Sequence, residues 1–381
     1  MTRLGGGEGA RATGWRWLTV LVALALGACS SVEKPKPTPL EPLSAKITGK
    51  QVWRASLGKP LQGMAVVVLG DRFLLASADG RLTSLDIGTG AVRAQASVGA
   101  ALSAGVGSDG RHAAVVTQDN ELVVLDGQRE IWRTRLNSRV VTAPLVAGER
   151  VFVQAVDRSV LAFDVFDGRR LWTVGRSGEA LSLAQPGVLL AYRNTLLVGM
   201  GARLLALDPL TGAQRADSTI GSPRGTNEVE RLADLVGPAA RSGEVVCARA
   251  FQVAVTCLNA ERNTVLWSRP QGGFEGLAID SEFVSGADAT DRISVWRRAN
   301  GDVAWTSDRL RYRGLTAPLS VGSTLVFGDS EGWLHVFSND RGDPLLRLQT
   351  DGSAIVAPLV RSGLTVLAVT RSGNVFAFRP E

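Results

Sequence analysis

Histidine and cysteine are scarce in this sequence, and their scarcity excludes most kinds of site chemistry. The 381 residues include two histidines and three cysteines. Neither His112 nor His335 has a second histidine or a cysteine at the spacing that a metal site needs, so we expect both to be structural. No nucleophile has a visible base, and no glycine-rich phosphate loop precedes a helix. We therefore expect no metal, no cofactor and no catalysis.

Lysine is also rare, and the charge pattern argues against a nucleic-acid partner. The formal net charge is +6, all five lysines lie before residue 60, and the remaining basic residues are arginines scattered among acids. A nucleic-acid-binding surface needs a dense basic block, and none is present. The acidic segment Asp329–Gly332 offers oxygen ligands for a cation, but a β-turn beside a strand explains it at least as well.

The first 28 residues have the features of an export signal. The apolar run Leu18–Leu26 follows three arginines and is too short to cross a bilayer, which takes about 20 apolar residues. It ends in Leu26-Gly27-Ala28-Cys29, which resembles the bacterial lipobox, whose cysteine thiol accepts a diacylglycerol. The alternative is an ordinary secretory signal with a chance cysteine. We predict a signal peptide over 1–28 and a lipid anchor on Cys29, held in the outer membrane because Ser30 replaces the aspartate that favours the inner membrane.

A proline-rich segment follows the predicted anchor. Prolines 35, 37, 39 and 42 prevent a packed core and favour the extended polyproline II conformation. At about 3.1 Å per residue such a segment could hold a globular body well away from the bilayer. The sequence predicts a tether over 29–45 that makes no contacts with the core of the body.

The remaining residues, 46–381, contain a repeat that predicts an all-β fold. Each copy is a series of short β-branched and apolar runs ending in a turn with aspartate, a glycine four residues later and a tryptophan eight residues later. In the second copy, Asp126 and Trp132 are separated by a turn that is two residues shorter. The apolar residue before each turn marks the copies: Leu85, Leu125, Phe163, Leu207, Leu258, Trp296, Phe337 and Phe378. Four short strands per ~40 residues predict an eight-bladed β-propeller.

The two ends of the repeat array predict how the ring closes. The eighth copy stops soon after Phe378, before its final strand, whereas Gln51-Val52-Trp53-Arg54 near the start matches Glu130-Ile131-Trp132-Arg133 of the second copy. A spare N-terminal strand would not explain why this segment carries the tryptophan that the eighth copy lacks. We expect the N-terminal strand to complete the last blade and remove both exposed sheet edges.

Two cysteines of the body could form a disulfide. Cys247 and Cys257 are separated by ten residues, so that they can face each other across a hairpin on one side of the sheet. An oxidising periplasm would permit the bond. We favour the disulfide, and two small buried thiols are the alternative.

The blade frame also resembles that of quinone-dependent alcohol dehydrogenases, whose tryptophans join neighbouring blades. Those enzymes build a cofactor chamber from long insertions, with a ring of paired cysteines, a stacking tryptophan and acidic calcium ligands. Here eight blades use nearly all of the roughly 330 body residues, and Cys247 and Cys257 are not adjacent. We therefore disfavour an enzyme of this kind.

Two segments resemble a second family, the BamB lipoproteins of the outer-membrane β-barrel assembly (BAM) machinery. They are Gly314–Pro318 followed by Leu325–His335, and the acidic loop Glu228–Asp234. The resemblance implies a non-catalytic scaffold that binds the periplasmic POTRA domains of BamA and helps unfolded outer-membrane proteins to fold and insert. A periplasmic peptide- or ligand-binding propeller lipoprotein, or a sensor propeller, is the alternative, and either predicts a central channel lined by ligand-binding groups.

The same resemblance implies the partner-binding residues. Leu181 and Leu183 match the paired leucines of the family, and Asp234 matches an aspartate, with Glu230 and Arg231 in the same loop. Two departures, Ala184 in place of an arginine and Val236 in place of a second aspartate, leave an apolar-centred contact with fewer charges.

The residues themselves allow other interpretations of these loops. Leucines in a loop rich in serine and glycine indicate a partner patch, although capping of the propeller core would also explain Leu181 and Leu183. The acidic loop could simply be solvated, with an internal glutamate–arginine bridge at Arg231.

Overall fold

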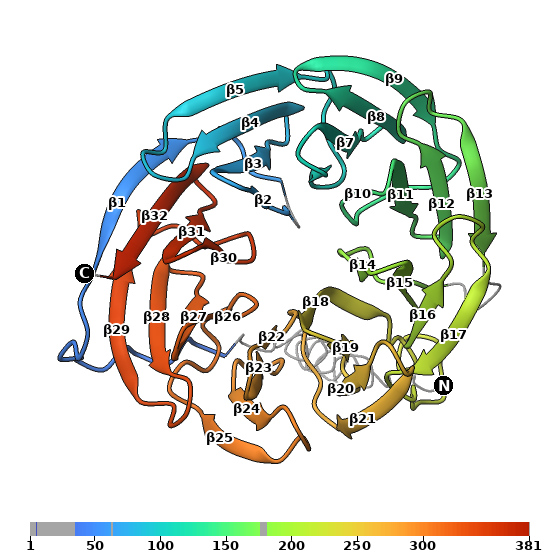
Figure 1. The fold of residues 1–381 in the computed structure, drawn as a ribbon. Helices are drawn as coiled ribbons and strands as arrows, with labels where there is room; N and C mark the ends of the chain where they lie inside the picture. Colours follow the sequence, from blue (N-terminus) through green and yellow to red (C-terminus); the bar gives the residue numbers. More distant parts are fainter. Residues whose placement is uncertain (1–4, 6–34, 62–63, 176–180, 381) are drawn as a thin grey trace, which may run out of the picture. The chain divides into compact units, whose positions relative to one another are not determined.

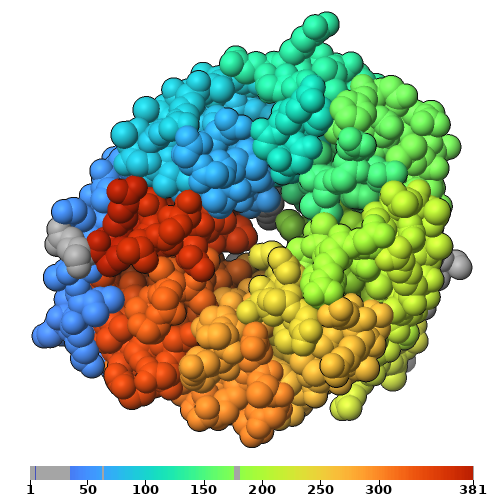
Figure 2. Space-filling model, in the orientation of Figure 1, coloured from blue at the N-terminus to red at the C-terminus, as the bar shows by residue number. Residues whose placement is uncertain are grey.

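The computed structural model describes Gly5 and residues 35–61, 64–175 and 181–380, and the following statements concern these residues. The chain divides into two units, Met1–Lys36 and Pro37–Glu381, and the second unit is a ring of sheets (Figure 1). Eight sheets of four antiparallel strands surround an open centre, which the space-filling view also shows (Figure 2). The predicted eight-bladed β-propeller is confirmed. The predicted signal peptide over 1–28 and Cys29 lie outside the described residues.

Each blade is listed from its innermost to its outermost strand. Blade 1 contains β2 (Val67–Leu69), β3 (Arg72–Ala76), β4 (Arg81–Asp86) and β5 (Val92–Ser97), and blade 2 contains β6 (Gly107–Ser108), β7 (His112–Val116), β8 (Glu121–Asp126) and β9 (Arg129–Arg135). Blade 3 contains β10 (Leu145–Ala147), β11 (Arg150–Gln154), β12 (Ser159–Asp164) and β13 (Arg170–Gly175), and blade 4 contains β14 (Leu189–Tyr192), β15 (Thr195–Met200), β16 (Arg203–Leu207) and β17 (Gln214–Thr219).

The second half of the ring follows the same order. Blade 5 contains β18 (Leu235–Ser242), β19 (Val245–Ala250), β20 (Ala254–Asn259) and β21 (Thr264–Arg269), and blade 6 contains β22 (Ala278–Ile279), β23 (Phe283–Ala287), β24 (Ile293–Arg297) and β25 (Val303–Ser307). Blade 7 contains β26 (Leu319–Val321), β27 (Thr324–Gly328), β28 (Trp333–Ser338) and β29 (Pro344–Gln349), and blade 8 contains β30 (Val360–Ser362), β31 (Thr365–Val369), β32 (Asn374–Pro380) and β1 (Gly49–Ser56).

Burial changes from the middle of each blade to its outer edge. All five residues of β7 are buried, because both faces of a middle strand pack against neighbouring blades, whereas the outer strand β5 alternates between exposed and half-buried residues. Such strands suit a core formed between sheets. No helix among the described residues is long and apolar enough to cross a membrane.

The ring closes through its first strand. β1 pairs antiparallel with β32, from Gly49 opposite Pro380 to Ser56 opposite Asn374. Trp53 is buried in this strand and its indole Nε1–H donates to the carbonyl of Ile87 in blade 1, at 2.9 Å. The prediction that the N-terminal strand completes the last blade is confirmed.

Tryptophans join neighbouring blades at five of the eight junctions. In each case an indole of the outer strand donates its Nε1–H to a backbone carbonyl of the next blade: Trp53 to Ile87, Trp132 to Val165, Trp172 to Pro209, Trp267 to Arg298 and Trp305 to Asn339. The turn glycine of the repeat lies under the indole ring. Gly90, for example, has φ +71°, and a Cβ at this position would clash with the ring of Trp53. The repeated Asp–Gly–Trp pattern therefore describes a contact between blades.

The segment before β1, residues 37–48, is here called the N-terminal strap, and it is bound to the propeller. The N–H of Thr38 donates to the carbonyl of Arg311 at 2.9 Å, and Arg313 Nη1 donates to the carbonyl of Thr38 at 3.0 Å. Leu40 packs against the apolar cluster around Phe327. The prediction that the tether over 29–45 makes no core contacts is therefore wrong at Leu40, because an extended backbone can still place an apolar side chain against the core of blades 6 and 7.

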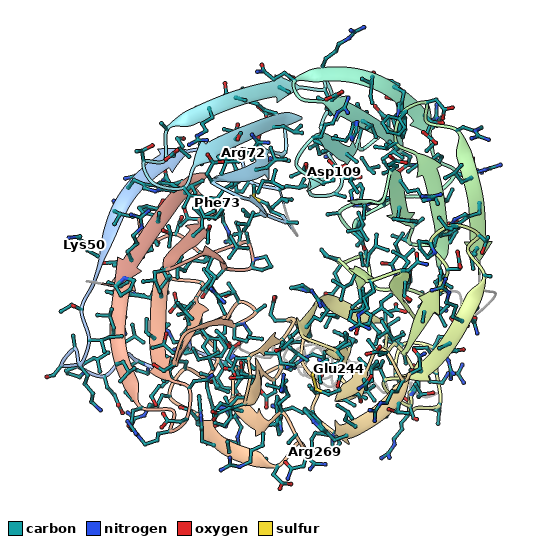
Figure 3. All side chains as sticks on the ribbon, viewed as in Figure 1. Lys50, Arg72, Phe73, Asp109, Glu244 and Arg269 are labelled. Carbon is teal, nitrogen blue, oxygen red and sulfur yellow. A yellow bond between two sulfur atoms is a disulfide. The ribbon has the colours of Figure 1, made fainter. Side chains whose placement is uncertain are left out.

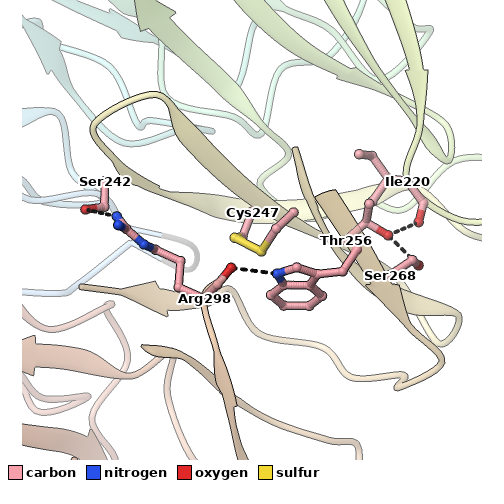
Figure 4. Close-up of a disulfide and its surroundings, with 8 residues drawn as sticks. Ile220, Ser242, Cys247, Thr256, Ser268 and Arg298 are labelled. Atoms are coloured by element: carbon pink, nitrogen blue, oxygen red, sulfur yellow. Dashed lines mark hydrogen bonds between the residues drawn. A yellow bond between two sulfur atoms is a disulfide. The ribbon is translucent and has the colours of Figure 1, made fainter. Parts of the chain in front are cut away.

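Cys247 and Cys257 lie directly opposite each other in β19 and β20, and their sulfurs are bonded (Figure 4). Their Cα atoms are 4.0 Å apart. Both residues are fully buried behind Trp267, at the junction between blades 5 and 6.

Candidate protein-binding face

The topology places every predicted partner-binding residue on one face of the ring. Strands of a blade alternate in direction, so the connection from an outer strand to the next inner strand lies on the same face as the turn between the two middle strands. We call this the connection face. Leu181 and Leu183 lie in the connection between β13 and β14, and Glu230, Arg231 and Asp234 lie in the connection between β17 and β18.

Asp234 and the leucine loop are in direct contact. Oδ2 of Asp234 accepts the backbone N–H of Leu183 at 2.7 Å, and Oδ1 accepts Nη2 of Arg158 at 3.3 Å. The same Nη2 donates to the carbonyl of Leu181 at 2.8 Å. Ser182, between the leucines, donates its hydroxyl to the carbonyl of Val156. The carboxylate and the guanidinium thus hold the backbone of residues 181–183 in place.

The consequence is a fixed loop with one apolar side chain projecting from it. The side chains of Arg158 and Asp234 are only 16% and 14% exposed, whereas Leu181 is 40% exposed and Leu183 is half-buried. The resemblance implies that Asp234 contacts the partner. In the structure its carboxylate is used inside the protein.

The acidic loop is held by its own hydrogen bonds. Oε2 of Glu230 accepts the N–H of Thr226 at 2.8 Å, and this bond lowers the pKa of the Glu230 carboxyl. Arg231 is half-buried. Val229, the residue before Glu230, is 70% exposed, so this loop also presents an apolar side chain.

Sequence reasoning missed several members of this face. Phe274 (47% exposed) and Tyr312 (37% exposed) lie in the two connections that follow those of Leu181 and Val229 around the ring. Phe274 packs against Phe251 with ring centroids 5.6 Å apart. The shared position after the outer strand of each blade was a signal that could have found them. Arg158 lies in a turn between middle strands, far from the loop in sequence, and no local pattern indicates its role.

The centre of the ring is an open channel of about 850 Å³. Its lining is mostly apolar side chains and backbone, with Glu275 and Arg371 as the ionisable groups. Burial raises the pKa of the Glu275 carboxyl to about 7, against a hydrogen bond from the N–H of Ala317. Arg249 lies fully buried nearby and donates through Nη1 to the carbonyls of Gly272 and Ala287. Among the described lining residues, the other polar side chains are Thr142, Gln185 and Thr316.

The segment around Asp329 is a hydrogen-bonded turn. Oδ1 of Asp329 accepts the N–H groups of Glu331 and Trp333, and Oδ2 accepts Nε of Arg313 and Nε2 of His335, both at 2.9 Å. Burial would raise the pKa of Asp329, but these bonds outweigh it and lower the pKa. In the described part of the chain, no group of three or more His, Cys, Asp or Glu residues is placed to hold a metal ion.

This turn also binds the N-terminal strap, because the Arg313 that pairs with Asp329 donates to the carbonyl of Thr38. The family-like segment Leu325–His335 is therefore used to fix the beginning of the body to blade 7.

Fold and site together define a class: a closed eight-bladed propeller of quinoprotein-like repeats that presents apolar side chains on rigid loops of one face. Solved structures agree with the fold. The crystal structure of BamB from Moraxella catarrhalis has a TM-score of 0.79 at 23% identity, and covers 87% of this chain and 100% of that one. A quinohemoprotein alcohol dehydrogenase from Comamonas testosteroni has a TM-score of 0.66 at 13% identity, covering 87% and 76%.

Sequence comparison is more specific than fold. The family model described as outer membrane protein assembly factor BamB matches residues 43–102 and 78–307. The outer membrane protein assembly factor BamB of Burkholderia pseudomallei is 34% identical over 365 residues, which cover 94% of this chain and 96% of the relative. The chain belongs to the BamB family of outer membrane protein assembly factors.

Proposed function

We propose that the protein is a non-catalytic scaffold of the outer-membrane protein assembly machinery. It acts from the periplasmic face of the outer membrane, where a lipid on Cys29 anchors it, and it binds the POTRA domains of BamA through the connection face. The observation that carries the proposal is the clamped loop 181–183 on a rigid ring. A rigid loop with a projecting leucine loses little conformational entropy on binding, which favours a protein contact.

The site is centred on Leu181 and Leu183, together with Val229 of the acidic loop in the neighbouring connection. Asp234 and Arg158 support the loop from within, and Glu230 and Arg231 belong to the polar surroundings. The contact is therefore expected to depend weakly on salt, because its centre is apolar and the nearest carboxylate is already paired.

Binding of the purified protein to isolated POTRA domains tests the partner. Leu181→Ala combined with Leu183→Ala should weaken the affinity by about 2 kcal/mol or more, roughly 30-fold, as truncation of an interface anchor does. Leu210→Ala is a matched control, because Leu210 is 53% exposed in a turn on the opposite face of the ring. Thermal melts of the same samples separate the two causes of weaker binding.

Unchanged affinity in the double-leucine variant would eliminate this patch as the contact. An equal loss in Leu210→Ala would show that the effect is not specific to this patch. A loss that parallels a drop in melting temperature would show that the leucines act by capping the core.

A further inference from the structure

The outer strand of every blade has one residue, next to a β-bulge, whose side chain faces the following blade. Five of these residues are the tryptophans described above. The register of the third and fourth strands identifies the other three. They are Ala94 in blade 1, Ala216 in blade 4 and Leu346 in blade 7, and they pair with Ser84, Ala206 and Val336, respectively. Three junctions therefore lack the indole that fills the others.

The junction between blades 1 and 2 contains an open cavity at this position. Its volume is about 230 Å³, and its lining includes Ala94, Gln95 and Ala96 on blade 1 and Gly127 and Gln128 on blade 2. Gly127 has a positive φ, and no atom lies within 4 Å of the point that a Cβ would occupy, in contrast to Gly90 under its indole. The shortened turn of blade 2 thus leaves space where a ring is missing. We call this cavity the blade 1–2 socket.

A buried hydroxyl without a partner lies on the wall of the socket. Leu74, Ser84 and Ala94 are paired across β3, β4 and β5, so their side chains form one row facing blade 2. Ser84 is only 7% exposed, and its Oγ makes no hydrogen bond. At the five tryptophan junctions the residue paired with the indole is apolar: Val124, Ala162, Cys257, Val295 and Ala377. The polar residue occurs at a junction where the indole is absent.

The mouth of the socket is basic. Arg72 and Arg111 line it, but Arg111 is already paired with the carboxylate of Asp126, Nη2 to Oδ2 at 2.8 Å. Arg72 therefore supplies the positive charge that a ligand would meet at the mouth. Arg72 of blade 1 crosses the junction, and its Nη2–H donates to the carbonyl of Gly110 in blade 2 at 2.8 Å. Figure 3 labels Arg72 on blade 1 and Asp109, the residue before Gly110, on blade 2. The carboxylate of Asp109 is occupied by the backbone and ring of His112. A ligand that carries a negative charge next to its apolar group therefore matches this site.

We propose that the blade 1–2 socket binds a single aromatic side chain of a partner protein, a tryptophan flanked by an acidic residue. Size supports this occupant, because a cavity of about 150 Å³ is enough to hold benzene. The five internal contacts show that this position of the blade accepts an indole against a glycine turn. Ser84 Oγ supplies an acceptor for the indole N–H, and Arg72 pairs with the flanking carboxylate. The inference goes beyond scaffold binding at the connection face, and the two sites use different blades.

The test uses the purified full-length protein and the peptide acetyl-Asp-Trp-Asp-amide carrying 5-fluorotryptophan, titrated by fluorine NMR. We expect a dissociation constant of millimolar order, typical of one buried ring. Ala94→Trp places the internal indole in the socket and should weaken peptide binding at least tenfold while raising the melting temperature. Ala216→Trp, the same change at the junction of blades 4 and 5, is the matched control and should leave binding unchanged. Ala94→Met fills the socket with a flexible chain if the tryptophan variant does not fold.

Ser84→Ala provides a second, independent readout. Loss of one hydrogen bond should weaken binding about two- to tenfold, whereas removal of an unpaired buried hydroxyl should raise the melting temperature of the free protein. A peptide with alanine in place of tryptophan should not bind. The proposal is overturned if the tryptophan peptide does not bind at 10 mM, if the alanine peptide binds equally well, or if binding survives in the folded Ala94 variants.

Discussion

Removal of the Asp234 carboxylate should release the leucine loop without unfolding the ring. In Asp234→Ala the N–H of Leu183 loses an acceptor at 2.7 Å, and the guanidinium of Arg158 loses one at 3.3 Å. A hydrogen bond to a charged group contributes about 1.5–3 kcal/mol. The longer bond to Arg158 falls at the low end, so loop opening should become easier by about 3 kcal/mol in total, which is roughly 100-fold.

Amide hydrogen exchange measures this opening directly. Exchange at Leu183 should accelerate about 100-fold in Asp234→Ala, and by less in Asp234→Asn, whose amide oxygen can still accept the N–H. Asp291→Ala is a matched control, because Asp291 accepts the N–H of Leu315 at 3.1 Å in the connection between blades 6 and 7. It should accelerate exchange at Leu315 and leave Leu183 protected. Unaltered exchange at Leu183 in Asp234→Ala would refute the clamp.

Three further predictions concern the ends of the chain and the channel. Deletion of residues 30–36 should leave the melting temperature unchanged, and deletion of 30–48 should lower it. Deletion of 30–57 should lower it most, because it removes the buried Trp53, worth about 3–5 kcal/mol, and exposes the edge of β32. Equal melting temperatures for the three deletions would contradict closure by β1. Cys29→Ala should release folded protein from the membrane fraction, and continued palmitate labelling of this variant would exclude Cys29 as the anchor. The pKa of Glu275 is raised from 4.5 to about 7, so the folded state binds the proton of this carboxyl more tightly than the unfolded state does. The free energy of unfolding should therefore fall by up to about 3 kcal/mol as the pH rises through this interval. Glu275→Gln should reduce the difference in unfolding free energy between pH 5 and pH 8, and an unchanged difference would show that other groups cause it.

The sequence determines the ring well because its signals are local and repeated. The spacing of Leu85, Leu125 and their equivalents reports strand number and turn position, and Trp53 reports closure because its repeat frame is incomplete without it. These features depend on periodicity within about ten residues, which sequence analysis detects. The cysteine pair follows from the same alternation of strand side chains.

The internal contacts of the site were not visible in the sequence. Arg158 and Asp234 are 76 residues apart, and Leu183 is 51 residues from Asp234, so the clamp arises from the stacking of blades 3 to 5. A carboxylate in a loop such as that of Asp234 is expected to face solvent or a partner, whereas the fold buries it against a neighbouring connection. The strap was misjudged for a related reason: proline content predicts an extended backbone, but an extended backbone can still bind along a blade, as Thr38 and Leu40 do.

Closure by β1 imposes an order on folding. Synthesis runs from the N-terminus, so Gly49 is made long before its partner Pro380. Blades 1 to 7 can form from contiguous sequence, but blade 8 joins strands from both ends of the body. Until β32 has been made, Trp53 has its place against Gly90 but no strand beside it, and β1 remains an unpaired edge. Folding therefore includes one long-range step, and its rate should respond to changes in β1 and β32 more than to changes in the middle blades.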